Sequence, residues 1–169
     1  IFNTSNNMSL KVSCLINYIG RKDKKENIKK FYLKYRKNKI LLNKWFATQI
    51  QYSTPKLALD RLRKLTTHSD FNMFNPNNFH SVIGTFAKRN FHAFHQEDGC
   101  GYKEIADWIK KIDPENPQIA ASTTKAFDQI KFLPKTYRTK AKASLNALSN
   151  GNNLSKDTSE ILNKIEESL

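Results

Sequence analysis

The sequence predicts an all-α protein, an array of antiparallel helical hairpins. Apolar residues recur at intervals of three and four along most of the chain, which is the spacing of one face of an α-helix. Asn, Ser, Pro and Gly, which begin and end helices, separate these periodic segments. No stretch shows the strict alternation of a β-strand. Because the connections between segments are short, consecutive helices are expected to pack as antiparallel neighbours.

The N-terminal part is expected to form three helices. The first, Met8 to Ile19, stops before Gly20, which suits a left-handed helix cap. The second runs from Glu26 to Lys37. The third, Ile40 to Gln51, carries an apolar band wide enough to be buried on more than one side, formed by Leu41, Leu42, Trp45, Phe46 and Ile50.

Prolines mark most of the later helix starts. Proline lacks the backbone N–H that a first helical residue leaves unused, and a preceding Thr or Asn can accept from the next amides. Such pairs occur at Thr54-Pro55, Asn75-Pro76 and Asn116-Pro117, and less cleanly at Leu133-Pro134. Two further helices are predicted over 119–130 and 134–148, and a last one from Ser155. The predicted inward faces are Leu57, Leu59, Leu62 and Leu65; Phe79, Val82, Ile83 and Phe86; Tyr102, Ile105, Trp108, Ile109 and Ile112; and finally Ile161 and Ile165.

The net charge of +14 is concentrated in the first 67 residues, which hold 16 Lys or Arg and three acids. Its densest run, Arg21 to Lys39, contains ten basic residues, two acids and several interleaved aromatic residues. Basic residues with aromatic neighbours are typical of single-strand nucleic-acid grooves. One hypothesis is therefore a freestanding basic helical module that binds nucleic acid. We favour a solvated amphipathic helix, because no RNA-binding signature or zinc-finger spacing accompanies the run.

Cysteine usage and hydropathy favour a soluble cytoplasmic protein with no membrane partner. Cys14 and Cys100 lie far apart and outside any CxxC spacing, so neither a disulfide framework nor a zinc ribbon is expected. No apolar run approaches the roughly 20 residues that span a bilayer, and no basic-then-apolar leader is present.

A series of short motifs occurs in a particular order and covers nearly the whole chain. The most informative is FHQEDGCGY at residues 94–102, followed by Asn116-Pro117-Gln118. In this order and spacing the series resembles the C-terminal end of the aminopeptidase N family, the zinc-dependent alanyl aminopeptidases. The other matching positions are Lys44 to Phe46, His68 to Phe71, Asn75 to Asn77, Gly84 to Phe86 and Asn153 to Ser155.

The resemblance implies a fold and a function. The implied fold is a right-handed superhelix of helical hairpins, an α-solenoid segment of the ARM/HEAT type. Residues 1–169 would form a single all-α domain, the C-terminal part of the family's helical domain without its N-terminal part. The implied function is non-catalytic: the segment walls the substrate chamber over the catalytic domain of an enzyme that removes N-terminal residues from peptides. Its partners would be that catalytic domain and peptide substrates, and nucleic acid is not expected.

The catalytic elements of the family are not found in this sequence. The family holds zinc with HExxH and a downstream Glu and binds the substrate amine with a GxMxN-type loop, and none of these motifs occurs here. GxSxG, Walker and GxGxxG motifs are also absent from the sequence. We therefore expect no catalytic residue in this segment, and zinc only in the full-length enzyme. Asp113 and Glu115, which flank Pro114, are expected to act as local helix caps.

His92 and His95, with Glu97, Asp98 and Cys100 close behind, form a weak metal-site signal. A zinc-protease helix needs histidines four apart with a Glu after the first, whereas these histidines are three apart. We expect no metal here. The resemblance instead matches His95 to a family histidine in a turn that organises the following helix.

One stretch is expected to approach the substrate. Asn116 is a credible N-cap and Pro117 a first helical residue, which leaves the Gln118 amide in the first turn. Gln118 matches a family glutamine that lines the substrate chamber, although a solvated glutamine fits the sequence equally well. Ser122 stands where many bacterial relatives have an arginine facing the chamber, so a positive charge is lost there. Lys125 could replace part of that charge.

Overall fold

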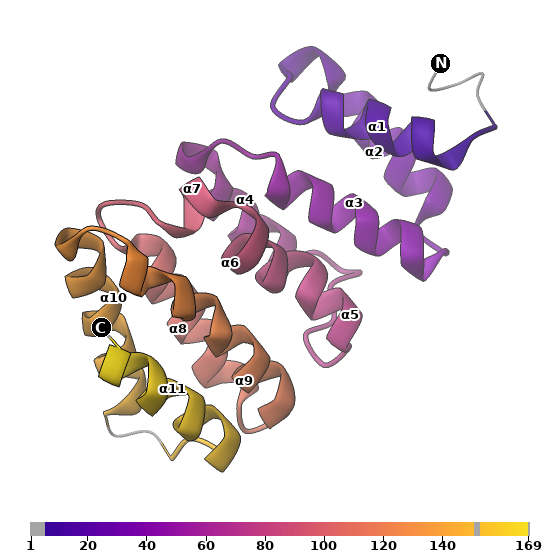
Figure 1. The fold of residues 1–169 in the computed structure, drawn as a ribbon. Coiled ribbons are helices and arrows are strands. Elements are labelled where there is room, and N and C mark those ends of the chain that lie inside the picture. Colours follow the sequence, from indigo (N-terminus) through magenta and orange to yellow (C-terminus); the bar gives the residue numbers. More distant parts are fainter. Residues whose placement is uncertain (1–5, 151–152, 169) are drawn as a thin grey trace.

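The computed structural model describes residues 6–150 and 153–168, in which every regular element is a helix. The all-α prediction is confirmed. The helices stack side by side in chain order, with the N-terminal hairpin at one end of the array and α11 near the other (Figure 1). Residues 1–5, 151–152 and 169 of the predicted domain lie outside the described residues. No helix in the described part of the chain is long and apolar enough to cross a membrane.

The elements follow the expected series of hairpins. The first half contains α1 (Met8–Tyr18), the 3₁₀ turn η1 (Lys22–Lys24), α2 (Lys25–Tyr35), α3 (Lys39–Gln51) and α4 (Pro55–Thr66). The middle contains α5 (Pro76–Phe79), the π-helical η2 (His80–Gly84), α6 (Thr85–Arg89), α7 (Phe91–Phe94) and α8 (Cys100–Ile112). The last part contains α9 (Pro117–Thr124), the 3₁₀ segment η3 (Lys125–Phe132), α10 (Lys135–Ser149) and α11 (Lys156–Ser168).

The predicted helix starts largely agree with the structure. Asn75 and Asn116 each accept a backbone N–H through the side chain, with proline as the first helical residue. Gly20 has φ +84°, the left-handed conformation expected after the first helix. Thr54 is the N-cap residue of α4, but its hydroxyl accepts no capping hydrogen bond, so this part of the prediction was wrong.

Three predicted details differ from the structure. Leu57 is 47% exposed, because α4 turns Ala58, Leu62 and Leu65 into the core instead. The helix predicted over 119–130 changes to 3₁₀ geometry after Thr124. The stretch from Phe79 to Phe86 passes through a π-helical turn, yet all four of its predicted inward residues are fully buried.

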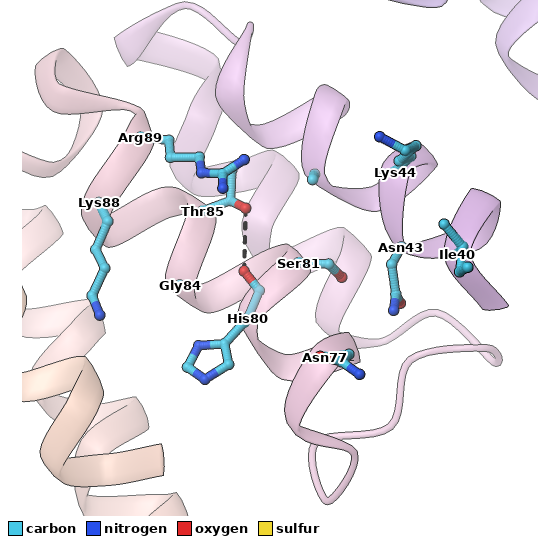
Figure 2. A pocket seen from close by; sticks show the side chains of 11 residues that line it. Ile40, Asn43, Lys44, Asn77, His80, Ser81, Gly84, Thr85, Lys88 and Arg89 are labelled. Carbon is cyan, nitrogen blue, oxygen red and sulfur yellow. Dashed lines mark hydrogen bonds between the residues drawn. The ribbon is translucent and has the colours of Figure 1, made fainter. Parts of the chain in front are cut away.

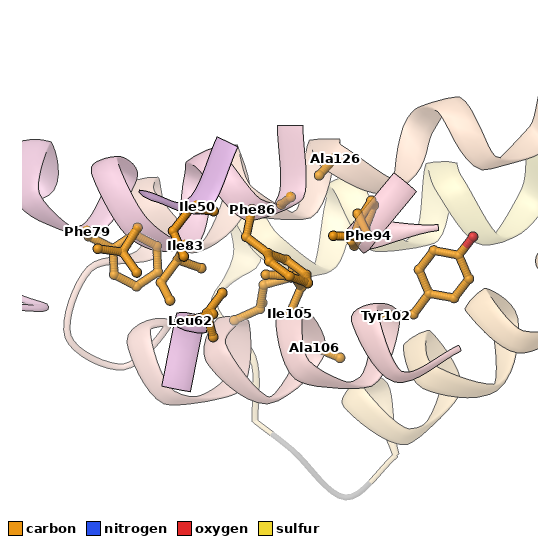
Figure 3. Close-up of a cluster of buried hydrophobic side chains, with 14 of the residues drawn as sticks. Ile50, Leu62, Phe79, Ile83, Phe86, Phe94, Tyr102, Ile105, Ala106 and Ala126 are labelled. Atoms are coloured by element: carbon orange, nitrogen blue, oxygen red, sulfur yellow. The ribbon is translucent and has the colours of Figure 1, made fainter. Parts of the chain in front are cut away.

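A single cluster of buried apolar side chains runs from α1 to α11. Its centre is aromatic: Phe79, Phe86, Phe94 and Tyr102 are 0% exposed and line up between the helices (Figure 3). The α7–α8 turn comes very close to this centre. A Cβ at position 101 would lie 2.8 Å from the Ala93 carbonyl oxygen and closer still to that of Phe94, so only glycine fits there.

Asp113 does not cap a local helix as predicted. It is 2% exposed and accepts from the backbone N–H of Ser155 at 2.6 Å and the Ser155 hydroxyl at 2.6 Å. It also accepts from the Thr158 hydroxyl at 2.5 Å. The Asp113 carboxylate therefore anchors the start of α11, although the two are more than 40 residues apart in sequence. They meet because α11 packs beside α9, which brings its first residues close to the end of α8.

Candidate functional site

Two pockets of the array lie next to each other, since a lining residue of the first, Lys88, contacts a lining residue of the second, Ser122. The central pocket, of about 570 Å³, lies between α3 and the α5–η2–α6 segment and is lined by Ile40, Asn43, Lys44, Ala47, Asn77, His80, Ser81, Gly84, Thr85, Lys88 and Arg89 (Figure 2). The C-terminal pocket, of about 540 Å³, lies between α9–η3 and α11 and is lined by Gln118, Ala121, Ser122, Lys125, Asp128, Asp157, Glu160, Ile161 and Lys164.

The structure brings the predicted chamber residues together in the C-terminal pocket. The Asn116 side chain accepts from the Ile119 N–H at 3.0 Å and sets the start of α9. This leaves Gln118 exposed in the first turn, and Ser122 half-buried one turn further on. Both line the same pocket, together with Lys125. Their role in a substrate chamber stays a prediction, but their shared surface is a fact of the fold.

Lys88 joins the two pockets, and sequence reasoning missed it. Its ammonium donates to the Ser122 carbonyl oxygen at 2.8 Å and lies 3.4 Å from the Ser122 hydroxyl. Burial lowers the pKa of Lys88, Lys125 lowers it further, and Asp128 opposes these effects. A positive charge therefore does reach the surface of α9 at Ser122, but from α6. The two residues are 34 positions apart, so only the packing of α6 near α9 shows the relation.

The C-terminal pocket has mixed charge. Lys125 and Lys164 share it with Asp128, Asp157 and Glu160. Glu160 and Lys164 form an exposed ion pair of 2.7 Å, and that hydrogen bond lowers the pKa of Glu160. With acids and bases interleaved, this pocket has no strong preference for an anion and suits a neutral polar ligand such as a peptide backbone.

The central pocket has the opposite character. Lys44, Lys88 and Arg89 line it with His80, and none of its lining residues is an acid. Glycine at position 84 leaves room for the His80 ring, because a Cβ there would lie 2.9 Å from His80 Nδ1. Burial lowers the pKa of His80, and the neighbouring Lys88 lowers it further. Both effects on the pKa favour the neutral form of His80.

The histidine and cysteine side chains of the 92–100 stretch do not converge on a metal position. His95 Nδ1 is hydrogen-bonded to the Tyr102 hydroxyl at 2.9 Å, and burial lowers the pKa of His95 to about 4. Burial raises the pKa of Cys100 to about 11, so this thiol is a poor source of thiolate. Within residues 6–150 and 153–168, no three His, Cys, Asp or Glu side chains are grouped so that they could hold a metal ion.

The basic run does not present a stacking surface. Phe31 is 1% exposed, and Tyr32 packs on Trp45 with ring centroids 4.8 Å apart while its hydroxyl donates to Asp70 at 2.7 Å. The aromatic rings thus belong to the hairpin interior, and the lysines of α2 lie on the solvated side. The described residues of this run therefore offer unstacked bases no exposed ring pair of the kind that single-strand binding uses.

Comparisons with known proteins agree on one family. Residues 1–167 match the family model described as "Domain of unknown function (DUF3458_C) ARM repeats". The chain is 34% identical over 139 residues to aminopeptidase N of Haemophilus influenzae, covering 82% of this chain and 16% of that protein. It is 34% identical over 131 residues to aminopeptidase N of Escherichia coli, covering 78% of this chain and 15% of that protein.

A solved structure gives the same result at the level of the fold. The crystal structure of Legionella pneumophila aminopeptidase A in complex with aspartic acid superposes with a TM-score of 0.89 at 25% identity, covering 97% of this chain and 19% of that one. The chain thus spans less than a fifth of each of these relatives. The ARM-repeat description confirms the predicted helical solenoid. This chain belongs to the DUF3458_C ARM-repeat family, the C-terminal domain of aminopeptidase N.

Proposed function

We propose that this chain is the non-catalytic C-terminal domain of a zinc-dependent aminopeptidase that removes N-terminal residues from peptides. The observation that carries the proposal is the match of almost the whole chain to the C-terminal domain of aminopeptidase N, at the level of sequence and of fold. The zinc ion and the catalytic base would lie on a catalytic domain elsewhere in the protein. When bound, zinc would supply Lewis-acid activation of water and of the scissile carbonyl there.

The contribution of this chain would be a wall of the substrate chamber. The Gln118 amide, in the first turn of α9, has no hydrogen-bond partner among the described residues and can both donate to and accept from a peptide backbone. Lys88 and Lys125 supply positive charge beside Ser122, where α9 itself has none. The proposal includes the cytoplasmic location expected from the sequence, since both cysteines are free thiols.

The longest natural polypeptide that contains this chain provides the first test. The proposal requires an open reading frame with HExxH upstream of Ile1, and zinc-dependent hydrolysis of alanyl or lysyl arylamides by the whole protein. The isolated 169-residue chain should not hydrolyse these substrates with or without added zinc. A whole protein without HExxH, or turnover by the isolated chain, would contradict the proposal.

The chamber role of Gln118 has its own test. Gln118→Ala should lower kcat/KM for a tetrapeptide by roughly 3- to 10-fold, the value of one net hydrogen bond, and leave an alanyl arylamide unaffected. Gln129→Ala, an exposed glutamine of η3 outside the pocket, is the matched control. Equal behaviour of the two variants with the tetrapeptide would remove Gln118 from the chamber.

A further inference from the structure

The central pocket holds positive charge that the fold does not use. Lys44 and Arg89 form no ion pair or side-chain hydrogen bond with another residue of the described ranges, and Lys88 bonds only to uncharged oxygens of Ser122. All eleven lining residues lack a carboxylate. A concave surface with one sign of charge and no internal partner is typical of a site for the opposite charge.

We propose that the central pocket binds a carboxylate group and, resting on the proposed function, that this group is the C-terminal carboxylate of a peptide in the chamber. Figure 2 shows the arrangement: Lys44 projects from α3, and Arg89 from the segment opposite, so that an anion between them is flanked from two elements. The planar guanidinium of Arg89 can donate two parallel hydrogen bonds to a carboxylate, while Lys44 adds a point charge.

The backbone of the pocket favours a carboxylate over a phosphate. Phosphate sites commonly use free backbone N–H groups at a helix start or in a glycine-rich loop. Lys44 and Ala47 lie inside α3, where the N–H groups are engaged in helical hydrogen bonds. At the start of α5, the Asn75 side chain accepts from the Asn78 N–H at 3.1 Å, which occupies one of the N–H groups there. The charged donors that line the pocket are all side chains.

The neutral part of the pocket suits the peptide that would carry the carboxylate. The Ser81 hydroxyl donates to the Asn78 carbonyl at 2.7 Å, which leaves its oxygen free to accept from a peptide N–H. Asn43 accepts from Asn78 Nδ2 at 2.8 Å through its amide oxygen, so its own NH₂ group is available as a donor. The volume of about 570 Å³ is within the range of pockets that bind small ligands, roughly 300 to 1,000 Å³.

The test uses the longest natural polypeptide that contains this chain and calorimetry at low salt. The ligands titrated are acetyl-Ala-Ala, the same peptide with its C-terminus amidated, and inorganic phosphate. The blocked N-terminus prevents turnover. The expected result is that the free acid binds about 10-fold tighter than the amide, and that Lys44→Gln/Arg89→Gln removes this difference. The control variant, Lys30→Gln/Lys110→Gln, removes the same amount of charge from exposed positions on α2 and α8. It should retain the preference for the free acid over the amide.

A second measurement reports on the pocket directly. A bound carboxylate should raise the pKa of His80, whose ring lines the pocket, and NMR of the imidazole would follow that change. The proposal is overturned if the acid and the amide bind alike, if the double variant keeps the preference, or if phosphate binds more tightly than the acid. Hydrolysis of alanyl arylamide, which carries no carboxylate, is measured in parallel, so that loss of the proposed activity and loss of the carboxylate site are distinguished.

Discussion

The N-terminal hairpin, α1 and α2, and the central block, α5 to α9, follow the same helical periodicity but are held in different ways. In the N-terminal hairpin only Lys11, Leu15 and Phe31 are buried, and Leu10 and Leu33 are about half exposed. In the central block most inward residues are fully buried between neighbours on both sides. The comparison shows that an apolar stripe predicts where a helix forms. The neighbouring helices that bury this stripe determine how much the helix is stabilised.

Buried polar contacts add to this difference. In the central block the Asn90 amide donates to the carbonyl oxygens of Ile50 at 2.8 Å and Ser53 at 2.9 Å, so that the end of α3, the α3–α4 loop and the start of α7 are joined at one point. The hairpin has a looser equivalent, in which the Lys11 ammonium donates to the Tyr35 hydroxyl at 3.1 Å. We expect substitutions in the central block to affect the whole protein, and those in the hairpin to have local effects.

A pair of glycine substitutions gives the largest expected contrast. Gly101→Ala in the central block forces a Cβ against the carbonyl oxygens of Ala93 and Phe94 and should lower the free energy of unfolding by about 3 kcal/mol or more. Gly20→Ala, in the connection between α1 and α2 of the N-terminal hairpin, has nothing within 4 Å of its Cβ and carries only the cost of its positive φ, about 1 kcal/mol. Urea unfolding measures both. Equal losses would contradict the comparison.

The anchor of α11 should have the next largest effect. Asp113→Ala leaves the Ser155 N–H and the Thr158 hydroxyl without their buried acceptor, and we expect a loss of about 3 kcal/mol. Asp157→Ala, on the exposed side of α11, is the matched control and should be close to wild type. Hydrogen exchange should show early opening of α11 in the Asp113 variant. If α11 stays protected, the anchor is less important than its geometry indicates.

His95 makes the central block sensitive to acid. In the folded chain its pKa is about 4, against 6.5 for an unhindered histidine, because burial opposes the charged form. Between these two values the unfolded state binds more protons, so stability falls as the pH is lowered from 6.5 towards 4. At pH 5 the loss from this group is about 2 kcal/mol. NMR should show His95 neutral at pH 5; a charged His95 at that pH would contradict the expected burial effect.

Much of this fold could be predicted because its determinants are local. The spacing of Phe79, Val82, Ile83 and Phe86 predicted a buried face that survives even the π-helical turn beneath it. Asparagine followed by proline predicted helix starts, since the capping chemistry involves only the next few residues. Leu57 marks the limit of what local spacing can predict. Either Leu57 or Ala58 can belong to the inward face of α4 on spacing alone, and in the structure the packing of neighbouring helices buries Ala58.

The candidate site could be predicted only where its residues share one helix. Gln118, Ser122 and Lys125 follow each other around α9 and its 3₁₀ extension, so their common surface is a consequence of helical geometry. The contact of Lys88 with Ser122 and that of Asp113 with Ser155 join distant segments. The sequence separation of either pair does not reveal that its members are in contact. The relative placement of α6, α9 and α11 depends on the packing of the whole core.

Substitutions in the basic run should have the smallest effect on stability, and they test the N-terminal hairpin side of the comparison. Lys29, Lys30 and Lys34 lie on the solvated face of α2, so their combined change to Gln should leave the unfolding midpoint nearly unchanged. Affinity for single-stranded DNA should be weak, about 10⁻⁴ to 10⁻⁶ M, and its slope against salt should fall by about 0.7 for each contacting charge removed. Fluorescence anisotropy across a salt series measures this, with Lys103, Lys110 and Lys142 changed to Gln as the control. Tight binding that persists at high salt would instead require stacking or base contacts. The Phe31 ring is buried, and the half-buried Tyr32 ring packs on Trp45 while its hydroxyl donates to Asp70, so these rings are already engaged within the fold.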